Sequence, residues 1–135
     1  MRLSGKNGIK EAILNKPGRP SAKEYAHVQR HPIIGEEIIR PVEIFRPVLP
    51  LLRNHHECFD GGGYPDGLKG EDINIFARII AVSDSFDAMT TDRLYRRALT
   101  VEEALFKIKR AIRTQFDPRI VDIFIGDKIY ERYLI

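Results

Sequence analysis

Apolar side chains recur along most of this chain at the spacing of an α-helix, and no stretch alternates convincingly with the period of two that a half-buried strand requires. The longest helical stretch runs from Ile75 to Met89 and predicts a buried helix with a wide apolar face. Its apolar positions include Phe76, Ile79, Ile80, Val82, Phe86 and Met89. The pattern therefore predicts an all-α fold.

Boundary signals divide the first half of the chain into short helices. The run Ser21–Glu24 is a capping box, so we expect a helix to begin there. Pro32 disfavours helical geometry at the residue before it, so we expect a break at His31 and a second helix over residues 33–39. A third helix is expected over residues 42–54, kinked or delayed by the two prolines inside it.

Two further signals mark helices in the second half of the chain. Thr100–Glu103 is another capping box, and Asp117-Pro118 supplies an N-cap followed by a proline suited to the first helical position. The residues expected to face inward are Ala104, Leu105, Ile108 and Ile112 on the first of these helices, and Ile120, Val121, Phe124 and Ile125 on the second. Residues 57–74 form a long glycine-rich segment, and such a loop inside a compact domain is usually functional or disordered.

The composition fits one soluble globular domain over residues 1–135. No apolar run approaches the roughly 18 residues of a membrane span, and the N-terminus lacks the apolar core of a signal peptide. The single cysteine, Cys58, excludes an intrachain disulfide and suits the reducing cytoplasm, where we expect the protein to reside. The net charge of +3, from 22 basic and 19 acidic side chains, is too small and too scattered to predict binding to a nucleic acid polymer.

Two adjacent histidines, His55 and His56, precede the glycine triplet Gly61–Gly63. Adjacent side chains on a helix point about 100° apart, so the two imidazoles can serve one metal centre only where the helix ends, or by addressing different ions. The glycines permit a positive φ and hence such an ending. His31 stands at another expected break, whereas His27 is interpreted as a surface or core residue. That same alternative applies to each histidine taken singly, and the adjacent pair beside acidic residues is what favours a metal site.

Asp84 is a further candidate ligand, because it interrupts the apolar run of the Ile75–Met89 helix between Val82 and Phe86. A carboxylate on an apolar face is costly unless it is paired or binds a metal. The alternative is an aspartate satisfied by a nearby arginine or by a backbone cap.

Three arginines, Arg93, Arg96 and Arg97, follow that helix directly. A guanidinium binds phosphate oxygens in a bidentate manner, so arginines on a loop beside a metal site suit a phosphate. Clustered arginines are also common on protein surfaces, and this signal alone indicates little.

The segment from Ile13 to Phe124 resembles the HD-GYP family, a bacterial subset of the HD-domain metal-dependent phosphohydrolases, in the order and spacing of its motifs. The matching pieces are Ile13–Gly18, His31-Pro32, the His55–Gly70 block, Ala77–Ile79, Ala81–Met89, Asp92–Arg96 and Thr114–Pro118. The resemblance implies an all-α, HD-domain-like helical bundle with two or three metal ions, usually iron or manganese. It also implies hydrolysis of the bacterial messenger cyclic di-GMP.

The same resemblance implies roles for individual residues. The implied metal ligands are His31, His55, His56 and Asp84. Lys6 falls on the catalytic lysine that faces the scissile phosphate, and Arg93 and Arg96 fall where the family holds the phosphates of the nucleotide. The loop that contains Gly63, Tyr64 and Pro65 is associated in the family with contacts to GGDEF-type cyclase partners.

One departure from the family pattern bears on activity. The His-Asp doublet should stand just before Gly5-Lys6, where this chain has Arg2 and Leu3. Arg2 places a fixed positive charge where a cation should bind, and Leu3 replaces the carboxylate that bridges two ions. The helices that precede the doublet in the family are also absent, so we expect an N-terminally incomplete domain, the C-terminal portion of the fold. Its site is expected to be incomplete and to hold one ion at most.

The expected function is therefore an HD-GYP-type phosphohydrolase domain for cyclic di-GMP that is impaired or inactive as this chain. The alternative is a non-catalytic module that binds a cyclic dinucleotide or a GGDEF-type signalling partner, and a further alternative is a truncated helical domain with no activity. Apolar surface left exposed by the absent helices predicts a homodimer or an exchange of helices between chains.

Overall fold

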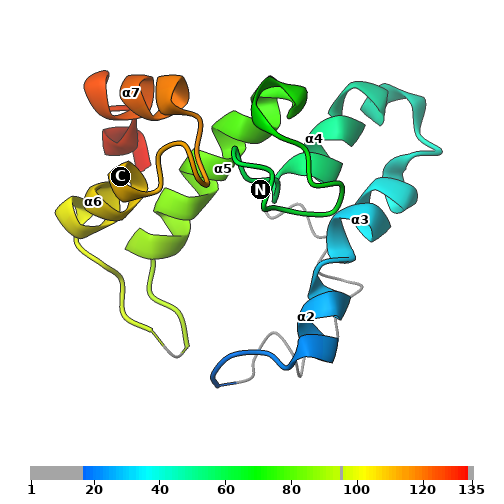
Figure 1. Cartoon of the computed structure of the whole chain (residues 1–135), viewed down its shortest axis with the longest axis horizontal. Coiled ribbons are helices and arrows are strands. Elements are labelled where there is room, and N and C mark those ends of the chain that lie inside the picture. Colours follow the sequence, from blue (N-terminus) through cyan, green and yellow to red (C-terminus); the bar gives the residue numbers. More distant parts are fainter. Residues whose placement is uncertain (1–16, 95, 134–135) are drawn as a thin grey trace.

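The computed structural model describes residues 17–94 and 96–133 (Figure 1). The predictions for Lys6 and for Arg2 and Leu3 lie outside the described residues. The described elements are α2 (Ala22–Val28), α3 (His31–Ile39), η2 (Glu43–Val48), α4 (Leu49–Asn54), η3 (Gly70–Asp72), α5 (Ile75–Thr90), α6 (Val101–Arg110), α7 (Pro118–Gly126) and η4 (Ile129–Tyr133), where η denotes a 3₁₀-helix. No β-strand occurs in these two ranges, and the all-α prediction is confirmed.

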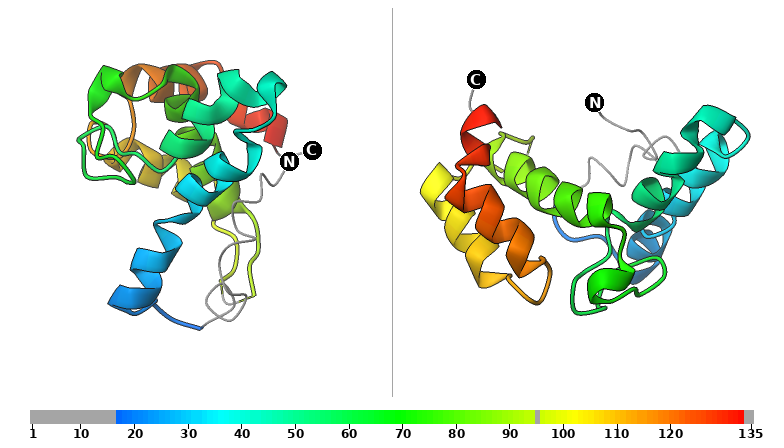
Figure 2. Two further views of the ribbon diagram at one scale, coloured as in Figure 1. Left: turned by 90° about the vertical axis from the view of Figure 1, so that its right-hand side faces the viewer. Right: turned by 90° about the horizontal axis from the view of Figure 1, so that it is seen from above.

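The helices form two groups that meet at α5. One group runs from α2 to α4, with α3 packed against α4, and the other contains α5, α6, α7 and η4. The view from above shows the two groups diverging, with the glycine-rich loop (residues 57–69) and η3 between them (Figure 2). Because α5 packs against α4 as well as against α6 and α7, it is the element that joins the two groups.

Local side-chain caps begin three of the helices as predicted. The Ser21 and Thr100 hydroxyls each accept a hydrogen bond from the backbone N–H three residues on, and the glutamate there returns a bond to the cap backbone. The Asp117 carboxylate accepts from the N–H of Arg119 at 2.9 Å and caps α7. These bonds span two or three residues, which is why the sequence alone reveals them.

The prolines act much as expected, with one correction at His31. Pro47 lies inside the 3₁₀-helix η2, and α4 begins only at Leu49, so the predicted delay of this helix is confirmed. The break before α3 falls at residues 29–30, and His31 is the first residue of α3 rather than a residue outside it. Pro32 is accommodated because the first turn of a helix does not use its own N–H groups.

The core joins one face of α5 to α6 and α7. Its buried members are Val82, Phe86, Ala104, Ile108, Phe116, Val121 and Phe124. The wide apolar face predicted for α5 is wrong at its first turns, where Phe76 is 62% exposed and Ile79 is 44% exposed. On α5, Val82 and Phe86 are buried in this core and Ala77 is buried outside it, whereas Phe76 and Ile79 are exposed. Periodicity cannot say how much of an apolar face finds a neighbour. No helix in the described part of the chain is long and apolar enough to span a membrane.

Candidate metal centre

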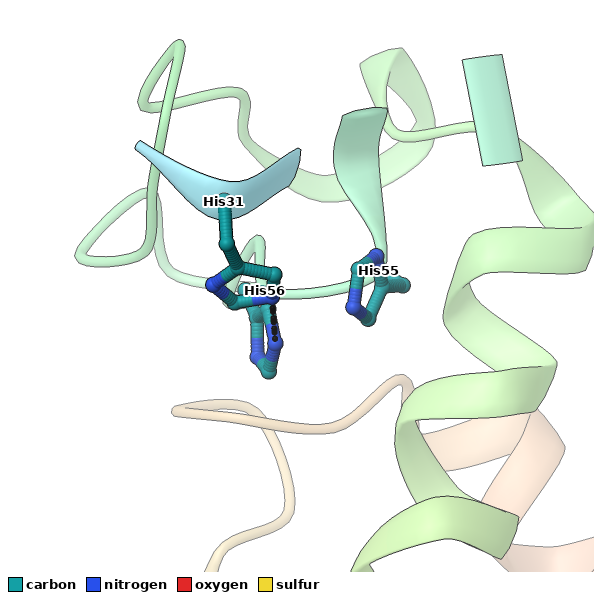
Figure 3. Close-up of side chains that lie close together, drawn as sticks. All are labelled: His31, His55 and His56. Atoms are coloured by element: carbon teal, nitrogen blue, oxygen red, sulfur yellow. Dashed lines mark hydrogen bonds between the residues drawn. The ribbon is translucent and has the colours of Figure 1, made fainter. Parts of the chain in front are cut away.

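Three imidazoles from two helices converge beside α5. His31 is the first residue of α3 and is buried, His55 is the C-cap of α4, and His56 follows it. The ring nitrogens that these residues offer lie within 4.8 Å of one another. Figure 3 shows the His31 ring next to the His56 ring, with His55 beside them. The structure therefore brings together the three histidines that the sequence had singled out as ligands.

Backbone carbonyls orient two of the rings. Nδ1 of His31 lies 2.6 Å from the carbonyl oxygen of Val28, and Nδ1 of His55 lies 2.7 Å from that of Leu52. A carbonyl can only accept, so each Nδ1 carries the proton and each Nε2 presents its lone pair. A hydrogen bond from the second ring nitrogen is the usual way in which a metal-binding histidine is held.

The spacing of the His31 and His56 rings fits a single divalent ion. The Nε2 atoms of His31 and His56 are 3.0 Å apart. Two nitrogens bound to one ion at about 2.0–2.1 Å are separated by about 2.8–3.4 Å for coordination angles between square and tetrahedral. The His55 and His56 rings have centroids 4.1 Å apart and planes inclined at 44°. The cluster could thus hold a metal through three neutral imidazoles.

Helix α4 ends directly before the adjacent histidines His55 and His56, as a shared metal site requires. α4 stops at Asn54, so His55 and His56 are not bound by the spacing of a continuing helix. The glycine triplet does not produce this ending, contrary to our expectation, because the helix stops before the triplet begins. Gly61, with φ +89°, instead turns the loop farther on. Gly63 is required for close packing, since a Cβ there would lie 2.3 Å from the backbone nitrogen of Cys58.

A cavity of about 250 Å³ adjoins the cluster. Its lining residues are His55, His56, Glu57, Cys58, Ala81, Asp84, Ser85, Ala88 and Gln115. Asp84 thus faces the same space as two of the histidines, although within the described residues its carboxylate is not part of the compact group formed by the three rings. Burial raises the pKa of the Cys58 thiol, so the thiol stays protonated near neutral pH.

The premise that singled out Asp84 needs correction. Asp84 is exposed, and it does not lie on the buried face of α5. At 3.6 residues per turn it is about 160° around the helix from both Val82 and Phe86. No cost of burial therefore constrains this carboxylate, and its position on the cavity is what makes it a candidate ligand.

Arg53 ties the glycine-rich loop to α3 and α4, and buried Glu57 at the start of the loop holds two of its later amides. Nε and Nη2 of Arg53 donate to the two carboxylate oxygens of Asp66 at 2.7 and 2.8 Å, and Nη1 donates to Glu36 at 2.8 Å. The hydrogen bonds from Arg53 lower the pKa of Asp66, and the Asp66 carboxylate raises that of Arg53. Buried Glu57 accepts from the backbone N–H groups of Asp66 and Leu68 at 2.7 and 3.0 Å.

The two arginines expected at the phosphates lie on the loop after α5 and are exposed. Arg93 and Arg96 pair through backbone hydrogen bonds of 2.8 and 3.2 Å. Neither arginine lines the cavity. The Arg96 guanidinium does donate a hydrogen bond to the carbonyl of Ala88, and Ala88 is one of the residues that line it. Arg96 therefore stands close to the cavity, and the described contacts do not bring Arg93 to it.

Gln115 is a cavity residue to which sequence reasoning assigned no role. It lies in the turn between α6 and α7, whose carbonyls at Thr114 and Gln115 accept from the N–H groups of Asp60 and Phe59 at 2.9 and 3.1 Å. This pairing joins the turn to the loop that follows the histidines. The Thr114–Pro118 motif was the available signal, but a motif without a spatial neighbour does not indicate which of its residues face a site.

Known proteins resemble this chain over most of its length. The HD domain family matches residues 5–120. A cyclic di-GMP phosphodiesterase response regulator, RpfG, from Xanthomonas campestris is 43% identical over 124 residues, which cover 90% of this chain and 32% of that protein. A 3'3'-cGAMP-specific phosphodiesterase from Vibrio cholerae is 38% identical over 114 residues, which cover 84% of this chain and 25% of that protein.

A solved structure shares the fold. The crystal structure of a cyclic GMP-AMP-specific phosphodiesterase from Vibrio cholerae superimposes with a TM-score of 0.68 over 97% of this chain and 34% of that one, at 23% identity. At that identity the likeness bears on the fold alone. The chain thus spans about a quarter to a third of the length of the relatives and the structure it matches.

Proposed function

Because the chain belongs to the HD-domain family and to its HD-GYP type, we propose that it is a metal-dependent phosphohydrolase domain for a cyclic dinucleotide. The observation that carries this proposal is the convergence of the His31, His55 and His56 imidazoles, two of which are oriented by backbone carbonyls so that Nε2 is the unprotonated nitrogen. Cyclic di-GMP is the substrate we favour, since relatives act on it or on 3'3'-cGAMP. Both molecules present a phosphodiester flanked by purines.

Iron or manganese is the metal that we propose for the cluster. His31, His55 and His56 would hold it, with Asp84 on the cavity as a further ligand. When bound, a divalent ion supplies Lewis-acid polarisation of a phosphoryl oxygen. The carbonyls of Val28 and Leu52 keep two of the imidazoles in the tautomer that such an ion needs. Arg96 beside the cavity would meet the phosphate, and Arg93 would join it from the same turn.

We propose further that this chain turns over its substrate poorly. Arg2 and Leu3 stand where the family has its His-Asp doublet, so the carboxylate that would bridge a second ion is missing. The chain should then bind one ion, and the catalytic role expected of Lys6 has no two-ion centre to act with. This same observation favours a second candidate function, a non-catalytic module that binds a cyclic dinucleotide. We also propose two partners for the chain: a GGDEF-type protein, bound at the Gly63-Tyr64-Pro65 loop, and a second copy of the chain in a homodimer.

Metal analysis and a paired assay test these proposals. The protein loaded with manganese or iron should contain one ion per chain, and two tightly held ions would contradict the single-ion proposal. Cyclic di-GMP should bind in a titration, and product formation alongside binding identifies the enzyme. Binding without product identifies the non-catalytic module, while neither binding nor product would contradict both candidate functions. The variant with Arg2→His and Leu3→Asp should gain a second ion if the missing doublet limits the site.

A matched pair of variants distinguishes a carboxylate that lines the cavity from one elsewhere on the surface of the same helix. Asp84→Asn keeps the shape of the side chain and removes its charge, so it should weaken metal binding if Asp84 is a ligand. Asp87→Asn, on the same helix and also exposed, should leave the metal affinity unchanged. Equal metal affinities for the two variants would remove Asp84 from the proposed ligand set.

A further inference from the structure

The ring of Tyr64 lies flat against the imidazole of His56. The two centroids are 5.0 Å apart and the planes are inclined by only 19°. The same tyrosine ring meets His31 edge-on, with centroids 6.4 Å apart and planes at 77°. Tyr64 therefore contacts two of the three imidazoles of the cluster, although it comes from the loop and not from either helix that carries them.

Backbone contacts hold Tyr64 next to His56, the histidine on which its ring stacks. The N–H of Tyr64 donates to the carbonyl of His56 at 3.2 Å. The residue before it, Gly63, packs so closely on the chain that a Cβ would lie 2.5 Å from the Cα of Glu57 and from the carbonyl oxygen of His56. The loop thus folds back on the residues that follow α4, and no side chain separates the two backbones at this point.

Arg53 and Glu57, which flank the histidine pair in the sequence, hold the loop just beyond Tyr64. Buried Glu57 accepts from two loop amides, those of Asp66 and Leu68. Arg53 donates hydrogen bonds from two nitrogens to the carboxylate of Asp66 and from its third nitrogen to Glu36 on α3. The loop is therefore attached to α3 and α4, the same helices that supply His31 and His55, and its position relative to the cluster is set by these bonds.

On the premise of the proposed metal site, we propose that Tyr64 is a positioning residue for that site. Its flat ring restrains the rotation of the His56 imidazole so that Nε2 of His56 faces Nε2 of His31, and Glu57 and the Arg53–Asp66 pair hold the tyrosine there. Aromatic rings that stack in an offset manner are attracted beyond the effect of the buried area.

Cobalt titration of Tyr64 variants tests this inference, because the visible absorption of bound Co²⁺ reports the coordination geometry independently of activity. Tyr64→Phe keeps the ring and should bind Co²⁺ within about twofold of the wild type, with an unchanged spectrum. Tyr64→Leu removes the flat ring and should weaken binding by about 10- to 100-fold, the usual effect of losing a group that orients a ligand. Phe106→Leu, which alters an exposed aromatic residue on α6, is the matched control and should change nothing.

The outcomes separate this inference from the function it rests on. If the wild type binds Co²⁺ and Tyr64→Leu binds it equally well with the same spectrum, the positioning role is wrong and the metal site stands. If Tyr64→Phe is as weak as Tyr64→Leu, the hydroxyl and not the ring is responsible, and the proposal is again wrong. A wild type that binds no divalent ion removes both proposals together.

Nuclear magnetic resonance of the metal-free protein gives a second reading that needs no bound ion. A stacked ring shields the protons of the imidazole beneath it, so the C–H resonances of His56 should move downfield in Tyr64→Leu and stay in place in Tyr64→Phe. Glu57→Gln replaces one acceptor oxygen by an amide that faces a backbone N–H, so it should cause part of the same shift. An unchanged His56 spectrum in folded Tyr64→Leu would show that the two rings do not stack in solution.

Discussion

At the scale of single residues, each histidine of the cluster is constrained from outside the cluster. The carbonyls of Val28 and Leu52 fix the tautomers of His31 and His55, and the Tyr64 ring lies on His56. Imidazoles that are already oriented lose less rotational freedom when a cation arrives, so such restraints favour binding. The chemistry of the site therefore depends on a few groups that are not themselves expected to bind the metal.

His55→Ala should lower the affinity for Mn²⁺ by at least about tenfold, because one of three converging nitrogens is removed. His27→Ala provides the matched control, since His27 is a half-buried histidine on α2 that is not in the cluster. Isothermal titration calorimetry measures the Mn²⁺ affinity of both variants. Equal losses of affinity in the two variants would show that the effect comes from general loosening of the fold and not from a lost ligand.

Asp66→Asn should remove an acid-sensitive part of the stability. Hydrogen bonds from Arg53 lower the pKa of Asp66 in the folded protein, so the unfolded chain takes up a proton at a higher pH than the folded one. The stabilisation is complete above the ordinary carboxyl pKa and is lost as the pH falls from about 4 towards the lowered value. Urea unfolding between pH 7 and pH 3 should show a smaller decline for the variant, and identical declines would contradict the assignment.

At the scale of elements, short-range caps begin the helices and a few long-range bonds join them. The most enclosed of these is the ion pair between Arg78 on α5 and Asp117 at the start of α7, with Nη1 and Oδ2 2.5 Å apart. The two side chains are only 9% and 1% exposed, and Asp117 also caps α7. One carboxylate thus both begins α7 and attaches it to α5.

Asp117→Ala should therefore cost about 3–5 kcal/mol of unfolding free energy, because Arg78 is left buried without its partner. Asp117→Asn keeps an acceptor for the cap and should cost less, about 1–3 kcal/mol. Denaturant unfolding measures both values. Glu43→Gln, which breaks the exposed pair with Arg46, is the control and should leave the midpoint unchanged. A loss in Asp117→Ala no larger than in the control would show that the pair does not hold α5 to α7.

At the scale of the whole molecule, apolar side chains remain exposed at the end of the group formed by α2, α3 and α4. Ile44 is 79% exposed, and Val42 and Phe45 beside it are 45% and 44% exposed. They lie on and next to η2, away from the core that joins α5, α6 and α7. A contiguous apolar surface of this kind is commonly covered by association with another chain.

We expect a homodimer at micromolar concentration, measured by light scattering coupled to size-exclusion chromatography. Ile44→Asp introduces a charge into the exposed apolar surface and should shift the protein towards the monomer, since an unpaired charge is costly to bury. Asp122→Asn, a change on the exposed side of α7, should leave the mass unchanged. A monomeric wild type would contradict the expected association.

The parts of the fold that the sequence predicted are those held by contacts between near neighbours in the chain. The caps at Ser21, Thr100 and Asp117 each join atoms two or three residues apart, and the prolines act on the peptide bonds next to them. The expected burial of α5 failed at Phe76 because burial depends on which other helix packs against it. The apolar pattern alone also misplaced Asp84, although counting the turn angle from Val82 would have put it on the opposite side.

The helical class, the helix starts and, through the spacing of the motifs, the histidines from which a metal site could be built all follow from the order of the residues. The three-dimensional fold was needed to show that the Nε2 atoms of two histidines 25 residues apart lie 3.0 Å from each other, and that the tyrosine of the glycine-rich loop stacks on one of them. The two kinds of information differ because the interactions act over different distances along the chain. Hydrogen bonds within a helical turn are specified by the residues that make them, whereas the approach of α3, the end of α4 and the loop depends on the bonds of Arg53 and Glu57 acting together.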